Sequence, residues 1–139
     1  MGLLVDLQRI KAVLRESSTI AVVGFSPKEK RPSNVVGRYL LNAGYTVIPV
    51  NPGQRQIDGL VCYPSLLEVP GQIDIVDIFR RAEDVFPIVR EAVDREAKVI
   101  WMQQGIRNEE AARFAEEAGL FVVMDRCIKV DHQQLMAEK

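Results

Sequence analysis

The sequence predicts an α/β protein with a Rossmann-like, doubly wound parallel sheet in a three-layer αβα arrangement. Three features favour this fold: short apolar runs rich in β-branched residues recur, helical periodicity separates most of them, and a glycine turn follows the first run. Such alternation is typical of parallel sheets whose strands are joined by right-handed helical crossovers. The length of 139 residues, without an internal repeat or linker, indicates one domain over residues 1–139.

Five apolar runs have the length and composition of buried strands. In chain order they are TIAVV (19–23), YTVIPVNP (45–52), IDIVDIF (73–79), AKVIWM (97–102) and LFVVMD (120–125). Pro49 cannot donate a ladder hydrogen bond, so the second strand is expected at an edge or in an irregular ladder. Residues 53–71 are rich in turn formers and predict a connection with one short helical turn near residues 65–67.

Helical spacing of apolar residues predicts a helix before the first strand and helices after most of the others. These helices cover about residues 5–16, 33–44, 82–97 and 108–120, and the tail is compatible with a last short helix. Ser33 or Asn34 is expected to cap the second helix and Gly44 to end it, while Asn108 caps the fourth.

Charge and composition narrow the range of partners. The formal net charge of −1 disfavours nucleic acid and membrane surfaces. No run approaches the roughly 20 apolar residues of a membrane span, and Asp6, Arg9 and Lys11 stand too early for a secretory signal. Cys62 and Cys127 are far apart and lack metal-binding spacing, so we expect a cytoplasmic protein with reduced thiols.

The first loop of the predicted sheet has the features of an anion site. Parallel sheets bind ligands beyond the carboxyl ends of their strands, where the strand order reverses. Residues expected at that edge are 24–33, 51–55, 79–81, 103–107 and 126–129. The first loop supplies a glycine for close approach, two hydroxyls and three cations: Gly24, Ser26, Ser33, Lys28, Lys30 and Arg31. The alternative is a basic surface loop that is only solvated.

The same loop departs from the dinucleotide fingerprint G-x-G-x-x-G. Ser26 occupies the place of the second glycine, and no carboxylate follows the second strand until Asp58 to bond a ribose hydroxyl. Both departures disfavour NAD as the ligand of this loop. An adenosine that carries a phosphate on its ribose would tolerate Gln54 and Arg55 at that position.

Four motifs of the chain carry a resemblance to a known family. They are AVVGFSPKEKRPSNVVGRYLLNAGYTVIPVNP, IDGLVCYPSLLEVPGQIDIVDIFRR, VIWMQQGI and VVMDRC. Together they resemble the single-domain CoA-binding protein family and the CoA-binding domain that opens the succinyl-CoA synthetase α subunit. The resemblance implies a Rossmann-like domain that binds coenzyme A. The pyrophosphate and 3′-phosphate of CoA would suit the cations of the first loop through charge-assisted hydrogen bonds.

The resemblance also implies roles for individual residues. The turn at residues 24–26 would wrap the phosphates and the pantetheine, and residues 50–52 would border the adenosine. Phe79 and Arg80 would lie beside the nucleotide, and residues 102–104 would face the pantetheine arm. With the basic and hydroxyl residues, the expected binding set is Gly24, Phe25, Ser26, Lys28, Arg31, Ser33, Val50, Asn51, Pro52, Arg55, Phe79, Arg80, Met102, Gln103 and Gln104.

Some members of this set are expected to form apolar walls for the pantetheine. They are Phe25, Phe79 and Met102, and ordinary core packing is the alternative for the last two. The chain departs from the family where Ile128 replaces the proline that often follows the last cysteine. It also lacks the lysine that the synthetase places shortly after its matching proline.

No catalytic or metal constellation is evident in the sequence. His132, the single histidine, is expected to be a solvated tail residue, and with two distant cysteines it falls short of a zinc set. Asp74 and Asp77 on the third strand fit a capping or strand-end role better than that of a general base. Cys127, flanked by two cations, is a candidate for a mixed disulfide with CoA or for redox sensing, with an inert packed thiol as the alternative.

We therefore expect a non-catalytic carrier, sensor or regulatory module that binds CoA or an acyl-CoA. One alternative is an NAD(P)- or CoA-dependent enzyme that uses Asp77 or Cys127. Another is a nucleotide-binding subunit of a larger ligase-like complex. The apolar residues Leu3, Leu4 and Leu7 of the first helix are compatible with covering a sheet edge or with a homodimer contact. A separate protein partner is a further alternative.

Overall fold

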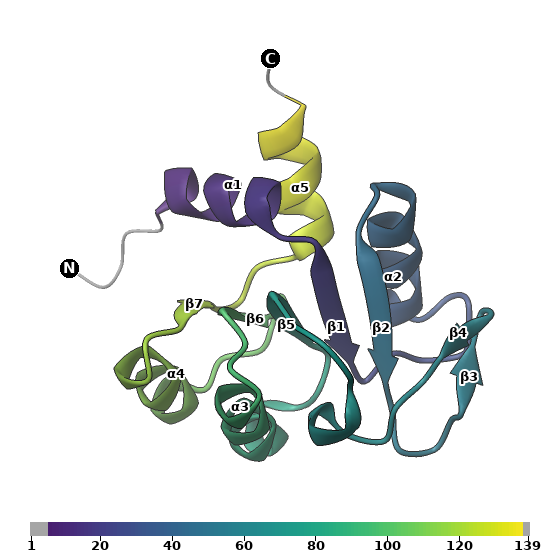
Figure 1. The fold of residues 1–139 in the computed structure, drawn as a ribbon. Helices are drawn as coiled ribbons and strands as arrows, with labels where there is room; N and C mark the ends of the chain where they lie inside the picture. Colours follow the sequence, from purple (N-terminus) through teal and green to yellow (C-terminus); the bar gives the residue numbers. More distant parts are fainter. Residues whose placement is uncertain (1–5, 138–139) are drawn as a thin grey trace.

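The computed structural model describes residues 6–137 and is built around a five-stranded parallel sheet (Figure 1). The strands are β1 (Thr19–Val23), β2 (Thr46–Val50), β5 (Ile75–Ile78), β6 (Val99–Met102) and β7 (Phe121–Val123). Their order is β2-β1-β5-β6-β7, and every neighbouring pair is parallel. The predicted doubly wound α/β fold is confirmed, and β2, which contains Pro49, is an edge strand as expected.

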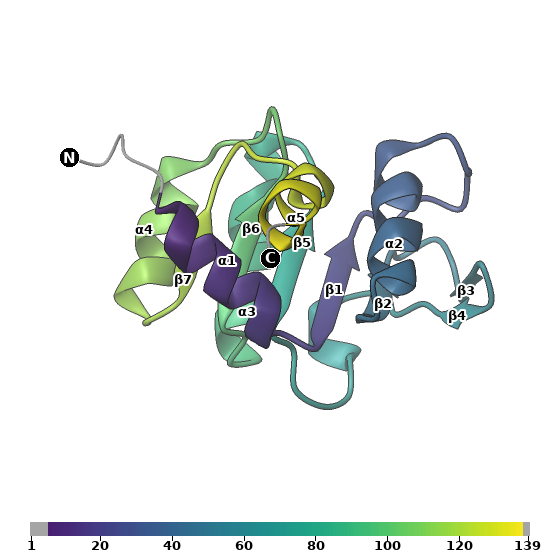
Figure 2. The same ribbon diagram turned by 90° about the horizontal axis from the view of Figure 1, so that it is seen from above.

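Helices cover both faces of this sheet (Figures 1 and 2). One layer holds α1 (Leu7–Glu16), α2 (Pro32–Asn42) and α5 (Ile128–Met136), and the other holds α3 (Val85–Asp94) and α4 (Glu109–Glu117). Side chains of β1 alternate between the layers because successive strand residues point to opposite faces. Ile20 and Val22 pack with the first layer, and Ala21 and Val23 with the second. Within residues 6–137, no helix is both long and apolar enough to cross a membrane.

Helix α2 begins earlier than the sequence predicts, and its cap differs. Arg31 precedes the first turn without a side-chain capping bond, and Pro32 occupies that turn, where proline is favoured. Ser33 and Asn34 therefore lie inside the helix, so the predicted capping role is wrong. Their side chains bond the preceding loop instead. The predicted cap of α4 by Asn108 is confirmed.

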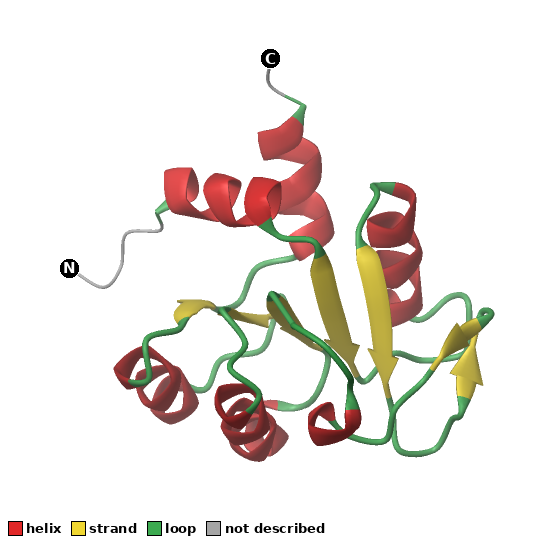
Figure 3. Cartoon of the chain, viewed as in Figure 1, coloured by secondary structure: helices red, strands yellow, loops and turns green. Residues whose placement is uncertain are grey.

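A short antiparallel hairpin lies in the connection after β2, where the sequence predicts only turns (Figure 3). Its strands are β3 (Gln56–Ile57) and β4 (Leu60–Val61). Asp58 and Gly59 have φ values of 52° and 82°, and two successive positive values are typical of a type I′ hairpin turn. The Asp-Gly pair is a known sequence signal for this turn. Two 3₁₀ turns complete the elements, η1 (Leu66–Glu68) and η2 (Ala82–Asp84).

The strand order reverses between β1 and β5. After β1 the chain adds β2 on one side and then returns to add β5 on the other. The loops that leave β1 and β5 therefore diverge, and a crevice opens beyond the carboxyl ends of these strands. The fold thus places a candidate ligand site at the loop that the sequence singles out.

Candidate functional site

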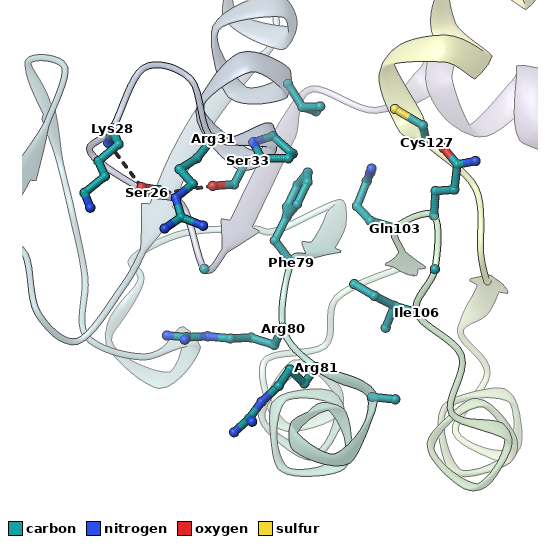
Figure 4. A pocket seen from close by; sticks show the side chains of 16 residues that line it. Ser26, Lys28, Arg31, Ser33, Phe79, Arg80, Arg81, Gln103, Ile106 and Cys127 are labelled. Carbon is teal, nitrogen blue, oxygen red and sulfur yellow. Dashed lines mark hydrogen bonds between the residues drawn. The ribbon is translucent and has the colours of Figure 1, made fainter.

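A cavity of about 860 Å³ lies at the carboxyl edge of the sheet, over the switch point (Figure 4). This volume falls within the usual range for small-molecule sites. The cavity is bounded by the loop after β1, the start of α2, the segments after β5 and β6, and the residue before α5. From the predicted binding set it collects Gly24, Ser26, Lys28, Arg31, Ser33, Phe79, Arg80, Gln103 and Gln104. The candidate redox residue Cys127 lines it as well.

The backbone at Gly24 passes directly against the end of β5. Gly24 has a φ of +88°, and a Cβ there would lie 2.6 Å from the carbonyl oxygen of Phe79. The Gly24 amide donates to the Val50 carbonyl at 2.8 Å, and the Phe79 amide donates to the Val23 carbonyl at 2.9 Å. Glycine is required here both for its conformation and for its lack of a side chain.

The loop between β1 and α2 is held in shape by its own hydrogen bonds. The Ser26 amide donates to the Ser33 hydroxyl at 2.8 Å, and the Lys28 amide donates to the Ser26 hydroxyl at 3.1 Å (Figure 4). The buried Asn34 amide group donates to the Ser26 carbonyl at 2.8 Å and to the Asp58 carboxylate at 2.9 Å. Because each hydroxyl accepts an amide N–H, its own proton is left to donate to a ligand oxygen. The loop is therefore preorganised before any ligand binds.

Four cationic side chains line the cavity: Lys28, Arg31, Arg80 and Arg81. Arg81 forms ion pairs with carboxylates of the η2 turn, the nearer being Asp84 at 3.4 Å. In the described part of the chain, no carboxylate lies within 4.0 Å of the charged groups of Lys28, Arg31 or Arg80. Lys30, the remaining cation of the first loop, is exposed and does not line the cavity. Unpaired cations around a concave surface favour an anionic ligand.

The rest of the cavity lining includes apolar residues and two side-chain amides. Val36, Phe79 and Ile106 contribute apolar surface, and Gln103 and Gln104 contribute the amides. Gln103 is only 5% exposed, and its Oε1 accepts a hydrogen bond from the Ile128 amide at 3.2 Å. This part of the lining suits a neutral, thin part of a ligand that carries a few amide groups.

Some lining residues lie outside the predicted set. They are Pro32, Val36, Arg81, Ala82, Gly105 and Ile106. Val36 lies one helical turn after Ser33, so the helical period could have placed both on one face. Arg81, Gly105 and Ile106 belong to segments that the sequence places at the ligand edge, but their residue types alone did not single them out.

Other residues of the predicted set lie outside this cavity: Phe25, Val50, Asn51, Pro52, Arg55 and Met102. The Phe25 ring fills the space beside Gly37, where a Cβ would lie 2.3 Å from the ring. Met102 is fully buried in the core between the sheet and α3 and α4. The side chains of Phe25 and Met102 are packed inside the protein and do not form walls of this cavity, and for Met102 this is the core packing given above as the alternative.

The residues after β2 border a second, smaller hollow. Val50 and Pro52 line this hollow of about 180 Å³. Arg80 lines both hollows and so lies between them. Asn51 holds the neighbouring turns, since its amide group donates to a carbonyl of the first loop at 2.9 Å. Arg55 is exposed and lines neither hollow.

Two titratable residues considered for chemistry lie away from the cavity. Asp77 is fully buried, and neither of its carboxylate oxygens has a hydrogen-bond partner within residues 6–137, so burial raises its pKa well above the usual value. His132 is half-buried, which corrects the prediction of a solvated residue. Its Nδ1 lies 2.7 Å from the Tyr39 hydroxyl, and burial lowers its pKa. The described residues contain no group of three side chains suited to hold a metal ion.

Comparison with known proteins gives relatives of matching length. An uncharacterized protein of Bacillus subtilis, YneT, is 45% identical over 123 residues, which are 88% of this chain and 91% of that protein. The solved structure of a hypothetical protein from Pyrococcus horikoshii OT3 superimposes with a TM-score of 0.92 at 40% identity. The superposition covers 95% of this chain and 93% of the other.

A third relative is a much longer enzyme. The ADP-forming acetate–CoA ligase I of Archaeoglobus fulgidus is 34% identical over 119 residues. These residues are 78% of this chain but 17% of the ligase, so the chain corresponds to a small part of that enzyme. The CoA binding domain family matches residues 18–133, which include every element that lines the cavity. The chain therefore belongs to the CoA binding domain family.

Proposed function

We propose that the chain binds coenzyme A or an acyl-CoA in the cavity at the carboxyl edge, as a carrier, sensor or regulatory module. The observation that carries this proposal is the division of the cavity into a cationic side and an apolar side. Within residues 6–137, Lys28, Arg31 and Arg80 have no carboxylate partner, while Phe79 and Gln103 line the part of the cavity toward Cys127. CoA has the same division, with phosphates at one end and a neutral pantetheine arm at the other.

The first loop would hold the phosphates. Lys28 and Arg31 would form charge-assisted hydrogen bonds with phosphate oxygens, which are stronger than neutral ones. The hydroxyls of Ser26 and Ser33 already accept a hydrogen bond from a backbone amide. Each would therefore donate its own proton to a phosphate oxygen. The pantetheine arm would then extend over Phe79. Membership of the CoA binding domain family supports CoA as the ligand.

The proposal is for binding rather than turnover. The titratable side chains that line the cavity are cations and one thiol. General acid–base chemistry uses a group that changes protonation near the operating pH, and the two candidates of that kind, Asp77 and His132, lie elsewhere. We therefore assign no reaction step to the binding residues.

Isothermal titration with CoA, dephospho-CoA, NAD and NADP tests the proposal. We expect CoA to bind about tenfold more tightly than dephospho-CoA, because the 3′-phosphate adds a charge-assisted contact. NAD should bind more weakly than CoA, since its ribose finds no carboxylate partner. Absence of heat with CoA, together with clear heat for NAD or NADP, would overturn the proposal and favour a dehydrogenase-type enzyme.

A second function is favoured by the likeness to the ligase. The chain would then serve as the CoA-binding part of a larger assembly whose other chain carries the catalysis. Purification of the tagged chain from its native cells at low salt should then yield a stoichiometric partner. A chain that elutes alone, at the size expected from its own mass, would contradict this second function.

A further inference from the structure

We infer that Cys127 is a thiol–disulfide exchange site, at which the thiol end of the bound ligand is held as a mixed disulfide. The inference rests on the proposed function, because it needs a ligand that ends in a thiol, as CoA does. The first loop would bind CoA reversibly, and the disulfide at Cys127 would in addition hold CoA covalently until a thiol reduces the bond.

Cys127 stands across the cavity from the first-loop cations. It is half-buried, lines the cavity and immediately precedes α5. In Figure 4 its sulfur faces the hollow on the side opposite Lys28 and Arg31, with Phe79 and Gln103 between them. A ligand that is anchored by its phosphates at the cations and extends over Phe79 therefore ends near the Cys127 sulfur.

A buried amide beside Cys127 points independently to a ligand. Gln103 is only 5% exposed, and its Oε1 is fixed by the amide of Ile128, the residue after Cys127. This hydrogen bond leaves the Gln103 Nε2 in the cavity wall, where no acceptor within residues 6–137 bonds it (Figure 4). The side chain is thus held in place by its oxygen, while its Nε2 faces the cavity and is free to donate to a ligand. An amide carbonyl close to the thiol of a ligand, as in the pantetheine arm, would supply that acceptor.

The reaction needs no oxidant other than the disulfide form of the ligand. The Cys127 thiol releases its proton to solvent, and the thiolate attacks one sulfur of CoA disulfide. The bond between the two ligand sulfurs breaks as the bond from the Cys127 sulfur to one of them forms. The second CoA leaves as a thiolate and takes a proton from solvent. An excess of a small thiol reverses the exchange and releases the held CoA.

The other cysteine is a natural control. Cys62 is 6% exposed and does not line the cavity. Burial raises the pKa of its thiol, and its Sγ lies 3.5 Å from the Asn51 carbonyl oxygen. Since the thiolate is the attacking form, exchange at Cys62 should be slow.

Mass spectrometry of the intact protein after incubation with CoA disulfide tests the inference. We expect one CoA adduct per chain, mapped to Cys127 and removed by dithiothreitol. The adduct should form in Cys62→Ala and fail to form in Cys127→Ser. It should form about tenfold or more faster than the adduct with glutathione disulfide, because binding of the phosphates positions the ligand sulfur.

Three outcomes would overturn the inference. A parallel titration distinguishes them from failure of the proposed function. The wild-type protein is titrated with reduced CoA in excess reductant. Reversible binding in that titration, without an adduct from CoA disulfide, would overturn the exchange site and leave CoA binding standing. An adduct that forms equally fast with glutathione disulfide, or on Cys62, would also overturn it. No binding of reduced CoA would reject the proposed function itself.

Discussion

The two edges of the parallel sheet contain similar charged residues but use them differently. At the amino edge, Asp74 accepts hydrogen bonds from the Ser18 and Thr19 amides at 2.8 and 3.0 Å and lies 3.7 Å from the Lys98 amine. The Arg9 guanidinium there stacks over a phenylalanine ring at 4.3 Å. At the carboxyl edge, Lys28, Arg31 and Arg80 have no carboxylate partner within residues 6–137. The charges of one edge stabilise the fold, and those of the other are available to a ligand.

The direction of the helices explains part of this difference. In a parallel α/β sheet, each helix that follows a strand begins at the carboxyl edge, where its N-terminal amides carry partial positive charge. Helices α2 and α5 both begin beside the large cavity. A hollow of about 290 Å³ also exists at the amino edge, lined by Arg9, Asp74 and Lys98. Because Asp74 contacts Lys98 and Arg9 stacks over a phenylalanine ring, a ligand there would have to displace existing interactions.

The largest expected effect on stability is that of replacing Gly24 at the carboxyl edge, and replacing Gly119 at the amino edge is its control. Gly24→Ala should destabilise the fold by about 3 kcal/mol and abolish CoA binding, because the new methyl group meets the Phe79 carbonyl and the backbone conformation disfavours a side chain. Gly119→Ala at the amino edge has a similar φ of +94° but open space around its Cβ, so it should cost about 1 kcal/mol. Urea unfolding and calorimetric titration measure both effects. Equal destabilisation by the two variants would contradict the close approach at Gly24.

Removal of single cations should have a smaller effect, confined to binding. Lys28→Ala or Arg31→Ala should weaken CoA binding about 10- to 100-fold, which is the contribution of one charge-assisted hydrogen bond. Lys30→Ala, in the same loop but outside the cavity, and Lys98→Ala, at the amino edge, should leave affinity within about twofold, since neither contacts the proposed ligand. The comparison requires titrations at one fixed salt concentration. If all four variants lose affinity alike, the attraction is general and no defined phosphate site exists.

A further effect depends on pH and concerns Asp77, whose carboxyl is buried and has no hydrogen-bond partner within residues 6–137. Burial raises the pKa of Asp77 in the folded state, so the folded protein binds more protons than the unfolded chain above the ordinary carboxyl pKa of about 4. The free energy of unfolding should therefore fall as pH rises from about 4 toward the raised pKa, by up to about 1.4 kcal/mol per pH unit. Asp77→Asn cannot ionise and should remove this fall.

Urea unfolding at pH 5 and pH 8 measures that effect. The wild-type protein should lose more stability between these values than Asp77→Asn does. Asp74→Ala provides the contrast at the amino edge, and it should destabilise the protein at both values because it leaves two backbone amides without their acceptor. Identical pH dependence in the wild type and in Asp77→Asn would show that Asp77 has no raised pKa.

The sequence predicted the fold well because its signals are local. Short β-branched runs, the glycine after β1 and the cap Asn108 each depend on neighbouring residues only, and the structure confirms them. The Asp58-Gly59 pair is an equally local signal for the hairpin, although only turns are predicted there from the sequence. Most polar members of the candidate site could also be predicted, since strand ends share one edge in a parallel sheet.

The sequence was less informative where the answer depends on packing across the sheet. Nothing local distinguishes Phe25, whose ring fills the space over Gly37, from Phe79, which lines the cavity. The tail histidine is half-buried because α5 folds back against α2, a contact between residues 93 positions apart.

A crystal structure of the protein grown with CoA would decide which edge of the sheet is the binding site. We predict phosphate oxygens within hydrogen-bonding distance of Lys28 and Arg31, and the pantetheine carbonyls directed toward Gln103, with the thiol end near Cys127. Density for CoA in the amino-edge hollow beside Asp74, or phosphates far from the first loop, would contradict the assignment of the carboxyl edge as the ligand site.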